Sequence, residues 1–372
     1  MTGTVLAPAS EAELAALIAE RHRARAPLRI AGGGTRVQTA HLPGDSLTVR
    51  GIAGIVTYSP GEMTLIARAG TPLDDIRLLL AAEGQALAFE PPDMRGVLGG
   101  TGVPTIGGVV AANASGPRRL AAGACRDHLL GLRFVDGQGR IIRNGGRVMK
   151  NVTGLDLGKL MAGAHGTLGV LTELALKTLP SLPERATLVF AGVTAAQAVA
   201  IFSAALATPF EVSGAAWRDG TAFLRIEGLG PQLAYRRARL LALFSDHRAE
   251  VLEADASDAL WSGLRDVTHF AGRDAPLWRV LVKPTEAPRA VAGLQALGGT
   301  ASLDWGGGLI WYAGPGRVAA VRAVAPNATL IRRAGLAGAA FAPLPPAVAR
   351  LQQGLRQTFD PAGILNPGLM EG

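Results

Sequence analysis

In the first part of the chain, the spacing of apolar residues is first that of a helix and then that of short strands. From Ser10 to Arg25, Ala, Leu and Ile recur among Glu and Arg at helical spacing, and Ser10 with Glu13 forms a capping box. This pattern predicts a helix that begins at Ser10. Short apolar runs predict strands at 28–31, 47–49, 55–59 and 64–69.

A second helix is expected to run to residue 82, with Thr71 as its N-cap and Pro72 at its first position. Residues 129–134 and 140–143 predict two strands, and the D-G-Q-G run between them predicts a hairpin turn. Together these elements predict a domain that mixes helices with strands.

From residue 187 the pattern changes to the order β-α-β-β-α-β, which is typical of a ferredoxin-like unit. Its strands are expected at 187–191, 212–218, 221–227 and 248–252, with helices ending at 206 and spanning 231–244. Further strands at 277–283, 302–305, 309–312 and 329–333 indicate a second set. A last helix is expected at 346–359, followed by an N-P-G turn at 366–368. This part of the chain therefore reads as a domain that covers a substrate.

The run P-T-I-G-G-V-V-A-A-N-A-S-G at 104–116 has almost no ionisable atoms and many small residues. Gly107, Gly108 and Gly116 lack a Cβ where the main chain turns or approaches a ligand, and Asn113 and Ser115 offer short polar groups. One interpretation is a glycine-rich turn between two buried segments. The other is backbone held close to a bulky ligand such as a flavin dinucleotide.

Two further glycine-rich blocks accompany this run. The predicted strand at 28–31 leads directly into G-G-G-T at 32–35, where successive backbone N–H groups could cradle a phosphate. Residues 146–170 contain six glycines, with Asp156 and Lys159 at close spacing. No G-x-G-x-x-G follows the strand and no G-x-x-x-x-G-K-[ST] occurs in the chain, which disfavours Rossmann dehydrogenases, kinases and P-loop ATPases.

Composition narrows the class of protein. A chain of 372 residues with 48% hydrophobic residues predicts two domains with a large core. The uncharged segment 186–210 divides into a strand and a Thr194-capped helix, so it does not predict a membrane span. The net charge of +8 comes from scattered arginines, which fits an acidic partner, an anionic ligand or a solvated surface better than nucleic acid. A single cysteine and no visible signal peptide predict a cytoplasmic protein.

Four motifs in combination resemble the FAD-binding domain of the vanillyl-alcohol oxidase and p-cresol methylhydroxylase (PCMH-type) family. They are R-I-A-G-G-G-T at 29–35, T-I-G-G-V-V-A-A-N-A-S-G at 105–116, K-N-V-T-G-L-D-L-G-K-L-M-A-G-A-H-G-T-L-G-V-L-T-E at 150–173 and F-D-P-A-G-I-L-N-P-G at 359–368. The resemblance implies an α+β fold with a two-subdomain PCMH-type FAD-binding domain at 1–180 and a ferredoxin-like cap at 181–335. A C-terminal segment at 336–372 would return to the FAD-binding domain.

The resemblance also implies site residues for a non-covalent FAD. The pyrophosphate would be held by Gly32, Gly33, Gly34 and Thr35. The pyrophosphate and the inner side of the isoalloxazine would be lined by Pro104, Thr105, Gly107, Gly108, Asn113 and Ser115. Near the adenosine half would lie Gly166, Gly169 and Val170.

Covalent flavin attachment, known in this family through His or Cys, has weak support here. The first glycine loop continues with Arg36 and offers no histidine. Cys125 and His128 lie near a region used for attachment in some members, but an isolated cysteine among Ala and Gly is more often a small core residue. His165, where relatives often carry Glu, reads either as a packed histidine or as a catalytic group.

Oxidation of a 2-hydroxy acid at a flavin needs a cation for the carboxylate and a base or metal for the hydroxyl proton. Arg279 is the first candidate for the cation and Lys283 the second, although Arg279 also reads as a surface residue on an edge strand. Trp305, Trp311 and Tyr312 either wall the pocket or form core. The six histidines are dispersed, so no metal site is predicted, and one cysteine cannot hold an iron-sulfur cluster.

Within the family, the chain is similar to FAD-binding subunits of bacterial glycolate oxidases. This implies an FAD-dependent oxidoreductase that acts on glycolate, with a larger flavoprotein subunit and an iron-sulfur subunit as partners. Membrane association would then come through those partners. Two alternatives stay open: a separate FAD-dependent 2-hydroxy acid oxidoreductase, and a non-catalytic flavin-binding assembly subunit.

Overall fold

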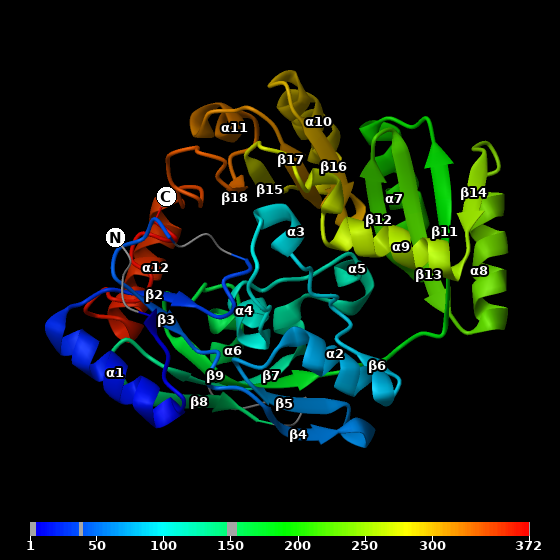
Figure 1. Cartoon of the computed structure of the whole chain (residues 1–372). Helices are drawn as coiled ribbons and strands as arrows, with labels where there is room; N and C mark the ends of the chain where they lie inside the picture. Colours follow the sequence, from blue (N-terminus) through cyan, green and yellow to red (C-terminus); the bar gives the residue numbers. More distant parts are fainter. Residues whose placement is uncertain (1–4, 37–39, 147–154, 372) are drawn as a thin grey trace. The chain divides into compact units, whose positions relative to one another are not determined.

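The computed structural model describes residues 5–36, 40–146 and 155–371, and its internal contacts divide the chain into two units (Figure 1). The first unit contains the chain up to Ala114 together with Ala124–Ser181 and Pro343–Gly372. The second unit contains Ser115–Gly123 and Leu182–Ala342. Each unit is therefore assembled from separate stretches of the chain.

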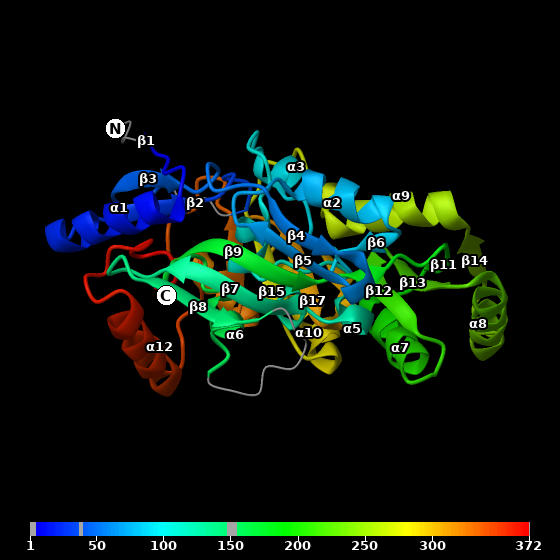
Figure 2. The ribbon, with the colours of Figure 1, turned by 90° about the horizontal axis from the view of Figure 1, so that it is seen from below.

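The first unit has two main sheets. A small parallel sheet has the order β1 (Val5–Leu6), β3 (Asp45–Thr48) and β2 (Leu28–Ala31). The larger sheet is antiparallel, and Figure 2 shows its strands side by side in the order β4 (Ile55–Ser59), β5 (Thr64–Arg68), β9 (Val170–Lys177), β7 (Leu129–Val135) and β8 (Ile141–Gly145). The predicted hairpin is confirmed, because β7 and β8 pair directly around its turn. A minor pair joins β6 (Gln85–Ala86) to β10 (Leu179–Pro180).

Several helices of the first unit pack against these sheets. In α1 (Glu11–Ala24) the buried residues are Leu14 and Ile18, four positions apart on one face. Ser10 is the N-cap as predicted and accepts the Glu13 N–H at 3.2 Å, but the Glu13 carboxylate accepts the N–H of Ala9 at 3.0 Å, so the predicted capping box forms only in part. The other helices are α2 (Leu73–Ala82), α3 (Arg95–Leu98), α4 (Ile106–Ala111), α6 (Leu157–Met161) and α12 (Pro346–Phe359).

The predicted N-cap of α2 is wrong. The N-cap is Pro72, which makes no side-chain capping bond. The Thr71 hydroxyl instead donates to the Arg68 carbonyl at 2.7 Å and accepts from the Gly54 N–H at 3.0 Å. Thr71 therefore ties the end of β5 to an earlier loop, because its hydroxyl has nearer backbone partners than the helix start offers.

The glycine-rich run at 104–116 contains a short helix, α4, rather than only a turn. Thr105 caps it by accepting the Gly108 N–H at 3.3 Å. A Cβ on Gly107 would lie 2.8 Å from the Ala69 carbonyl oxygen, so glycine is needed there for the helix to approach the backbone after β5. The absent side chains of this run thus serve packing as well as access to a ligand.

The second unit is one eight-stranded sheet made of two ferredoxin-like halves. The sheet order is β14-β11-β13-β12-β16-β17-β15-β18, and the halves meet where Trp217 of β12 pairs with Leu303 of β16. The first half contains β11 (Glu184–Ala191), α7 (Ala195–Leu206), β12 (Val212–Arg218), β13 (Thr221–Gly228), α8 (Gly230–Leu243) and β14 (Ala249–Leu252). The second contains β15 (Leu277–Leu281), α10 (Ala287–Ala296), β16 (Thr300–Asp304), β17 (Leu309–Ala313), α11 (Val318–Val324) and β18 (Thr329–Arg332). The ferredoxin-like prediction is confirmed, whereas α9 (Ala254–Arg265) between the halves was not predicted.

A short insertion from the middle of the first unit belongs to the second. Residues Ser115–Gly123, which include α5 (Arg119–Ala122), pack on β12. Arg118 Nε lies 3.5 Å from the carboxylate of Glu227 on β13, where both side chains are largely buried. The Trp305 indole N–H donates to the Gly116 carbonyl at 3.0 Å. These long-range contacts, rather than any local pattern, attach the insertion to the second unit.

The C-terminal segment returns to the first unit. In α12 the one buried residue is Phe359, whose ring centre lies 6.0 Å from that of Phe134 on β7. The chain then reaches β2, where Leu365 forms a bridge with Leu28. Among the described residues, no helix is both long enough and apolar enough to cross a bilayer.

Candidate functional site

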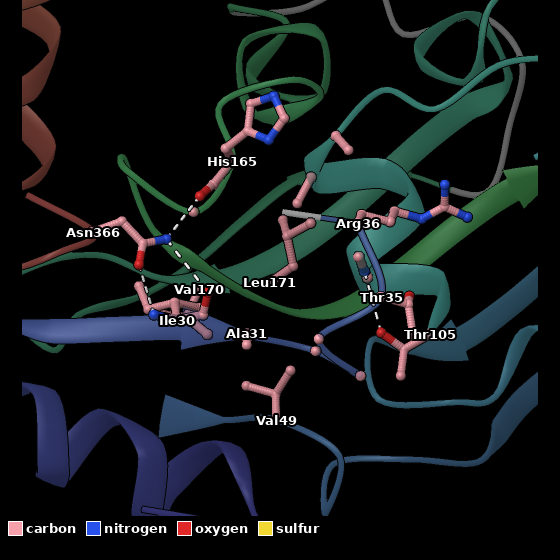
Figure 3. Close-up of a pocket in the computed structure, with 18 of the residues that line it drawn as sticks. Ile30, Ala31, Thr35, Arg36, Val49, Thr105, His165, Val170, Leu171 and Asn366 are labelled. Carbon is pink, nitrogen blue, oxygen red and sulfur yellow. Dashed lines mark hydrogen bonds between the residues drawn. The ribbon is translucent and has the colours of Figure 1, made fainter. Parts of the chain in front are cut away.

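A pocket in the first unit brings together five segments of the chain (Figure 3). They are the end of β2 with its glycine loop, the residue after β3, α4, the loop before β9 with the start of β9, and the C-terminal turn. The lining residues are Ile30, Ala31, Gly32, Gly33, Gly34, Thr35, Arg36, Val49, Thr105, Gly107, Gly108, Ala111, Ala112, His165, Gly166, Gly169, Val170, Leu171, Asn366 and Leu369.

The glycine loop after β2 presents backbone rather than side chains to the pocket. A Cβ on Gly33 would lie 1.6 Å from the Val103 carbonyl oxygen, so another residue cannot occupy this position without moving the chain. Gly34 has φ of 69°, which favours glycine. Among the described residues, none accepts a hydrogen bond from the backbone N–H of Gly33, Gly34 or Thr35. The loop therefore offers consecutive N–H donors of the kind that bind phosphate oxygens.

The start of α4 forms the facing wall. A Cβ on Gly32 would lie 2.4 Å from the Thr105 hydroxyl oxygen, so the loop and the helix cap are in close contact. A Cβ on Gly108 would meet nothing nearer than that hydroxyl at 3.4 Å, so Gly108 leaves room in the pocket. Ile30, Val49 and the residues of β9 supply apolar surface. Apolar walls with a few fixed polar groups are typical of cofactor sites.

His165 and Asn366 close another side of the pocket, as Figure 3 shows. Asn366 is fully buried, its Oδ1 accepts the Ile30 N–H at 2.7 Å, and its Nδ2 donates to the His165 carbonyl at 2.9 Å. The His165 N–H donates to the Ala111 carbonyl at 2.9 Å. Both residues have positive φ, 50° for His165 and 45° for Asn366. One amide therefore links the C-terminal turn to β2 and to the loop before β9.

Most of the residues assigned by resemblance line this pocket together. They are Gly32, Gly33, Gly34, Thr35, Thr105, Gly107, Gly108, Gly166, Gly169 and Val170. Three others lie outside the lining. The Pro104 carbonyl accepts the Leu73 N–H at 2.8 Å, and the Asn113 Oδ1 accepts the Arg126 N–H at 3.0 Å. Ser115 belongs to the second unit.

Sequence reasoning missed three polar lining residues. Arg36 follows the glycine loop directly, and its position in the sequence was the available signal. Its charge also acts on Asp93. Burial raises the pKa of that carboxyl group, but the hydrogen bonds from Arg95 and the charges of Arg95 and Arg36 outweigh burial and bring the pKa below the usual 3.8. Asn366 was noted only as part of a turn, and His165 was interpreted mainly as a packed residue.

Cys125 does not line the pocket and is fully buried. Burial raises the pKa of its thiol to about 12 despite the nearby charge of Arg36. A thiol with this pKa is a poor nucleophile for a flavin. His128 is also buried, and its ring centre lies 5.3 Å from that of Phe89. Both residues therefore fit the packed-core interpretation.

Arg279 lies in the second unit, on β15 between β17 and β18, so it does not occupy an edge strand. Its guanidinium carbon lies 5.3 Å from the centre of the Trp305 ring. Burial, with a smaller contribution from Arg119, lowers its pKa to about 10. Lys283, the second candidate, is 81% exposed beside Glu286. Trp311 and Tyr312 are buried, with Tyr312 in the core of the sheet.

Comparisons with known proteins show what this chain is similar to. Residues 3–145 match a family model described as an FAD binding domain. The chain is 34% identical over 350 residues to glycolate oxidase subunit GlcE of Escherichia coli (strain K12), covering 93% of each chain. It is also 29% identical over 178 residues to D-lactate dehydrogenase of Archaeoglobus fulgidus, but covers only 39% of that protein's length.

A solved structure shares the fold. The structure of alkyldihydroxyacetonephosphate synthase superposes on this chain with a TM-score of 0.69, and the superposition covers 98% of this chain and 75% of the synthase chain. At 16% identity, this similarity concerns the architecture alone.

Proposed function

Because the chain belongs to the PCMH-type FAD-binding family, we propose that it is the FAD-binding subunit of a complex that oxidises glycolate to glyoxylate. FAD is its cofactor, and FAD-dependent oxidoreduction is its class of chemistry. The similarity to a relative named as a glycolate oxidase subunit, over nearly the whole of both chains, supports the finer assignment.

The observation that best supports a flavin site is the glycine loop, whose backbone N–H groups donate to no other described residue. The N–H groups of Gly33, Gly34 and Thr35 would hold the pyrophosphate, because consecutive amides neutralise phosphate without lysines. Gly108 and Gly166 would let the cofactor approach the backbone, and the apolar lining would exclude water from it. When bound, FAD supplies the acceptor for a hydride from the carbon that bears the hydroxyl group.

The substrate carboxylate requires a cation, and Arg279 is our candidate. Among the described residues, no carboxylate pairs with its side chain, so a substrate carboxylate could neutralise it. Electrons from the flavin would pass to a larger flavoprotein subunit and an iron-sulfur subunit. The partner would have to supply such a cluster, because this chain has one cysteine.

The test uses the chain alone and the chain copurified with its neighbours. Both should carry a yellow flavin band, and its absence after FAD reconstitution would refute the flavin site. Anaerobic glycolate should bleach the flavin of the complex. Bleaching of the isolated chain would instead support a separate 2-hydroxy acid oxidoreductase. A flavin that stays oxidised in both would support the non-catalytic assembly subunit.

A further inference from the structure

Helix α12 carries an apolar stripe that is largely exposed to solvent. Val348, Leu351 and Leu355 recur at positions i, i+3 and i+7, so they lie on one face of the helix. Their exposed fractions are 46%, 71% and 36%. Phe359 lies on the same face, four positions after Leu355, and it is the one buried residue of this fully described helix. The stripe therefore runs from the core of the first unit out into solvent.

This helix lacks the contacts that normally stabilise one. Helices of about 12–15 residues are marginal in water when isolated, and most helices in proteins are stabilised by packing of their apolar face. α12 has 14 residues and buries one of them. Figure 2 shows it projecting from the first unit. Apolar residues at this spacing are typical of a helix that docks into a groove on another protein.

The charge around the stripe limits the kind of partner that fits. Residues 336–359 contain Arg350 and Arg356 but no Asp or Glu. Arg356 pairs with Glu371 at 2.6 Å, whereas no carboxylate of the described residues pairs with the exposed Arg350. A second copy of the chain would bring two such helices together, with no acidic residue on either to offset Arg350 or the net charge of +8. Complementarity therefore favours a different protein, with acidic side chains beside an apolar groove.

A lipid surface fits this helix less well. Helices that lie on membranes are rich in Lys and Arg on the polar face and have Trp, Phe or Leu on the other. The polar face of α12 carries mainly uncharged groups, such as Gln353, Gln357 and Thr358, and no aromatic side chain of the helix is exposed. One unpaired arginine gives little attraction to anionic lipid.

We propose that the stripe of α12 is the docking surface for the iron-sulfur subunit that accepts electrons from the flavin. Val348, Leu351 and Leu355 enter an apolar groove of that subunit, and Arg350 faces acidic side chains at its rim. The inference rests on the proposed function, which requires an electron acceptor outside this chain. α12 belongs to the unit that contains the flavin pocket, and the turn after it supplies Asn366 to the pocket lining. A partner on α12 is thus bound to the unit that would hold the flavin.

Calorimetric titration of the full-length, FAD-loaded chain with the purified iron-sulfur subunit tests this surface. Leu351→Gln keeps the helix propensity but removes the most exposed apolar side chain of the stripe. It should raise the Kd by about tenfold or more, the effect of losing one buried anchor of an interface. The matched control is Leu78→Gln on α2, at a leucine that is 73% exposed, which should leave the Kd unchanged.

Two further measurements separate docking from a general change in the chain. Arg350→Glu should raise the Kd and reduce its dependence on salt, because a repulsive charge replaces an attractive one. Arg289→Glu makes the same change at an exposed arginine of α10 and should alter neither quantity. Amide hydrogens of α12 should exchange rapidly in the free chain and slowly when the iron-sulfur subunit is bound.

A wild-type chain that does not bind the iron-sulfur subunit would overturn the inference, as would a Leu351→Gln chain that binds it with the wild-type Kd. Slow exchange of α12 in the free chain would also overturn it, because the chain would then cover the stripe itself. A dimer of the free chain that Leu351→Gln dissociates would assign the stripe to a second copy. Binding to phosphatidylserine vesicles that Leu351→Gln abolishes would assign it to a membrane, and either result refutes the proposal.

Failure of the proposed function looks different. Glycolate would then leave the flavin of the complex oxidised, although Leu351→Gln would still weaken binding of the iron-sulfur subunit.

Discussion

Replacing Asn366 by alanine tests the side chain that closes one side of the proposed flavin pocket. The substitution removes the amide that accepts the Ile30 N–H at 2.7 Å and donates to the His165 carbonyl at 2.9 Å. Both backbone groups lose their partner on a side chain that is fully buried in the wild type. Alanine must also adopt the φ of 45° that Asn tolerates more readily.

The expected loss of stability follows from these terms. Two hydrogen bonds contribute about 1 kcal/mol each, and alanine in the left-handed region costs about 1–2 kcal/mol. The sum is about 3–4 kcal/mol of unfolding free energy for the first unit. For a unit of this size, that corresponds to a fall in Tm on the order of 10 °C. Asn366→Gly should lose about 1 kcal/mol less, because glycine accepts the positive φ.

Two probes report the two units separately. All five tryptophans lie between residues 217 and 311, within the second unit, so tryptophan fluorescence follows that unit. Release of FAD, seen as a rise in flavin fluorescence, follows the first unit. We expect Asn366→Ala to shift the flavin transition more than the tryptophan transition. Asn327→Ala, at an exposed asparagine, should change neither by more than about 0.5 kcal/mol.

A flavin transition of Asn366→Ala within about 2 °C of the wild type would refute this reasoning. In that case the bonds to Ile30 and His165 would contribute no net stability. Equal losses for the alanine and glycine variants would show that the left-handed backbone carries no cost, and the hydrogen bonds alone would then account for the effect.

Two further predictions concern single residues of each unit. Gly33→Ala should abolish FAD retention, because the new Cβ would lie 1.6 Å from the Val103 carbonyl oxygen. Retention is measured as the ratio of flavin to protein absorbance. The control is Gly61→Ala, whose Cβ meets nothing within 4 Å and which should retain FAD. Burial raises the pKa of Glu227, but the positive charges of Arg225 and Arg118 outweigh burial and hold the pKa below the usual 4.5. Its contribution is therefore present above that value and lost as pH falls through the folded pKa. Glu227→Gln should cost about 3 kcal/mol at neutral pH and flatten the loss of stability in acid, and a pH profile parallel to the wild type in urea titrations followed by tryptophan fluorescence would contradict this.

The sequence predicted those parts of the fold that depend on neighbouring residues. The capping of α1 by Ser10 and the hairpin between β7 and β8 rest on contacts within a few positions. The Thr71 cap failed, because that hydroxyl bonds to Arg68 and Gly54 instead. Local spacing alone does not show which of several nearby partners a hydroxyl selects.

The sequence predicted the glycines that line the pocket but not the buried side chain of Asn366 that joins its segments. Gly32 to Gly34 can be recognised from the sequence, because packing alone rarely requires three consecutive glycines. Asn366 bonds to residues 336 and 201 positions earlier, and no local pattern connects them. The same holds for Arg119 and Trp305, which come together only through the folding of the insertion onto the sheet.

The interleaving of the two units has a consequence for synthesis on the ribosome. All segments of the second unit have been made once residue 342 emerges, because its insertion is translated early. The first unit, although it contains the N-terminus, still lacks Asn366 and the turn that contacts β2. Domains usually fold in the order of their synthesis, but here the unit that starts first must finish last. A chain truncated before this turn would lose Asn366 and Leu369 from the lining of the proposed flavin pocket while retaining every segment of the second unit.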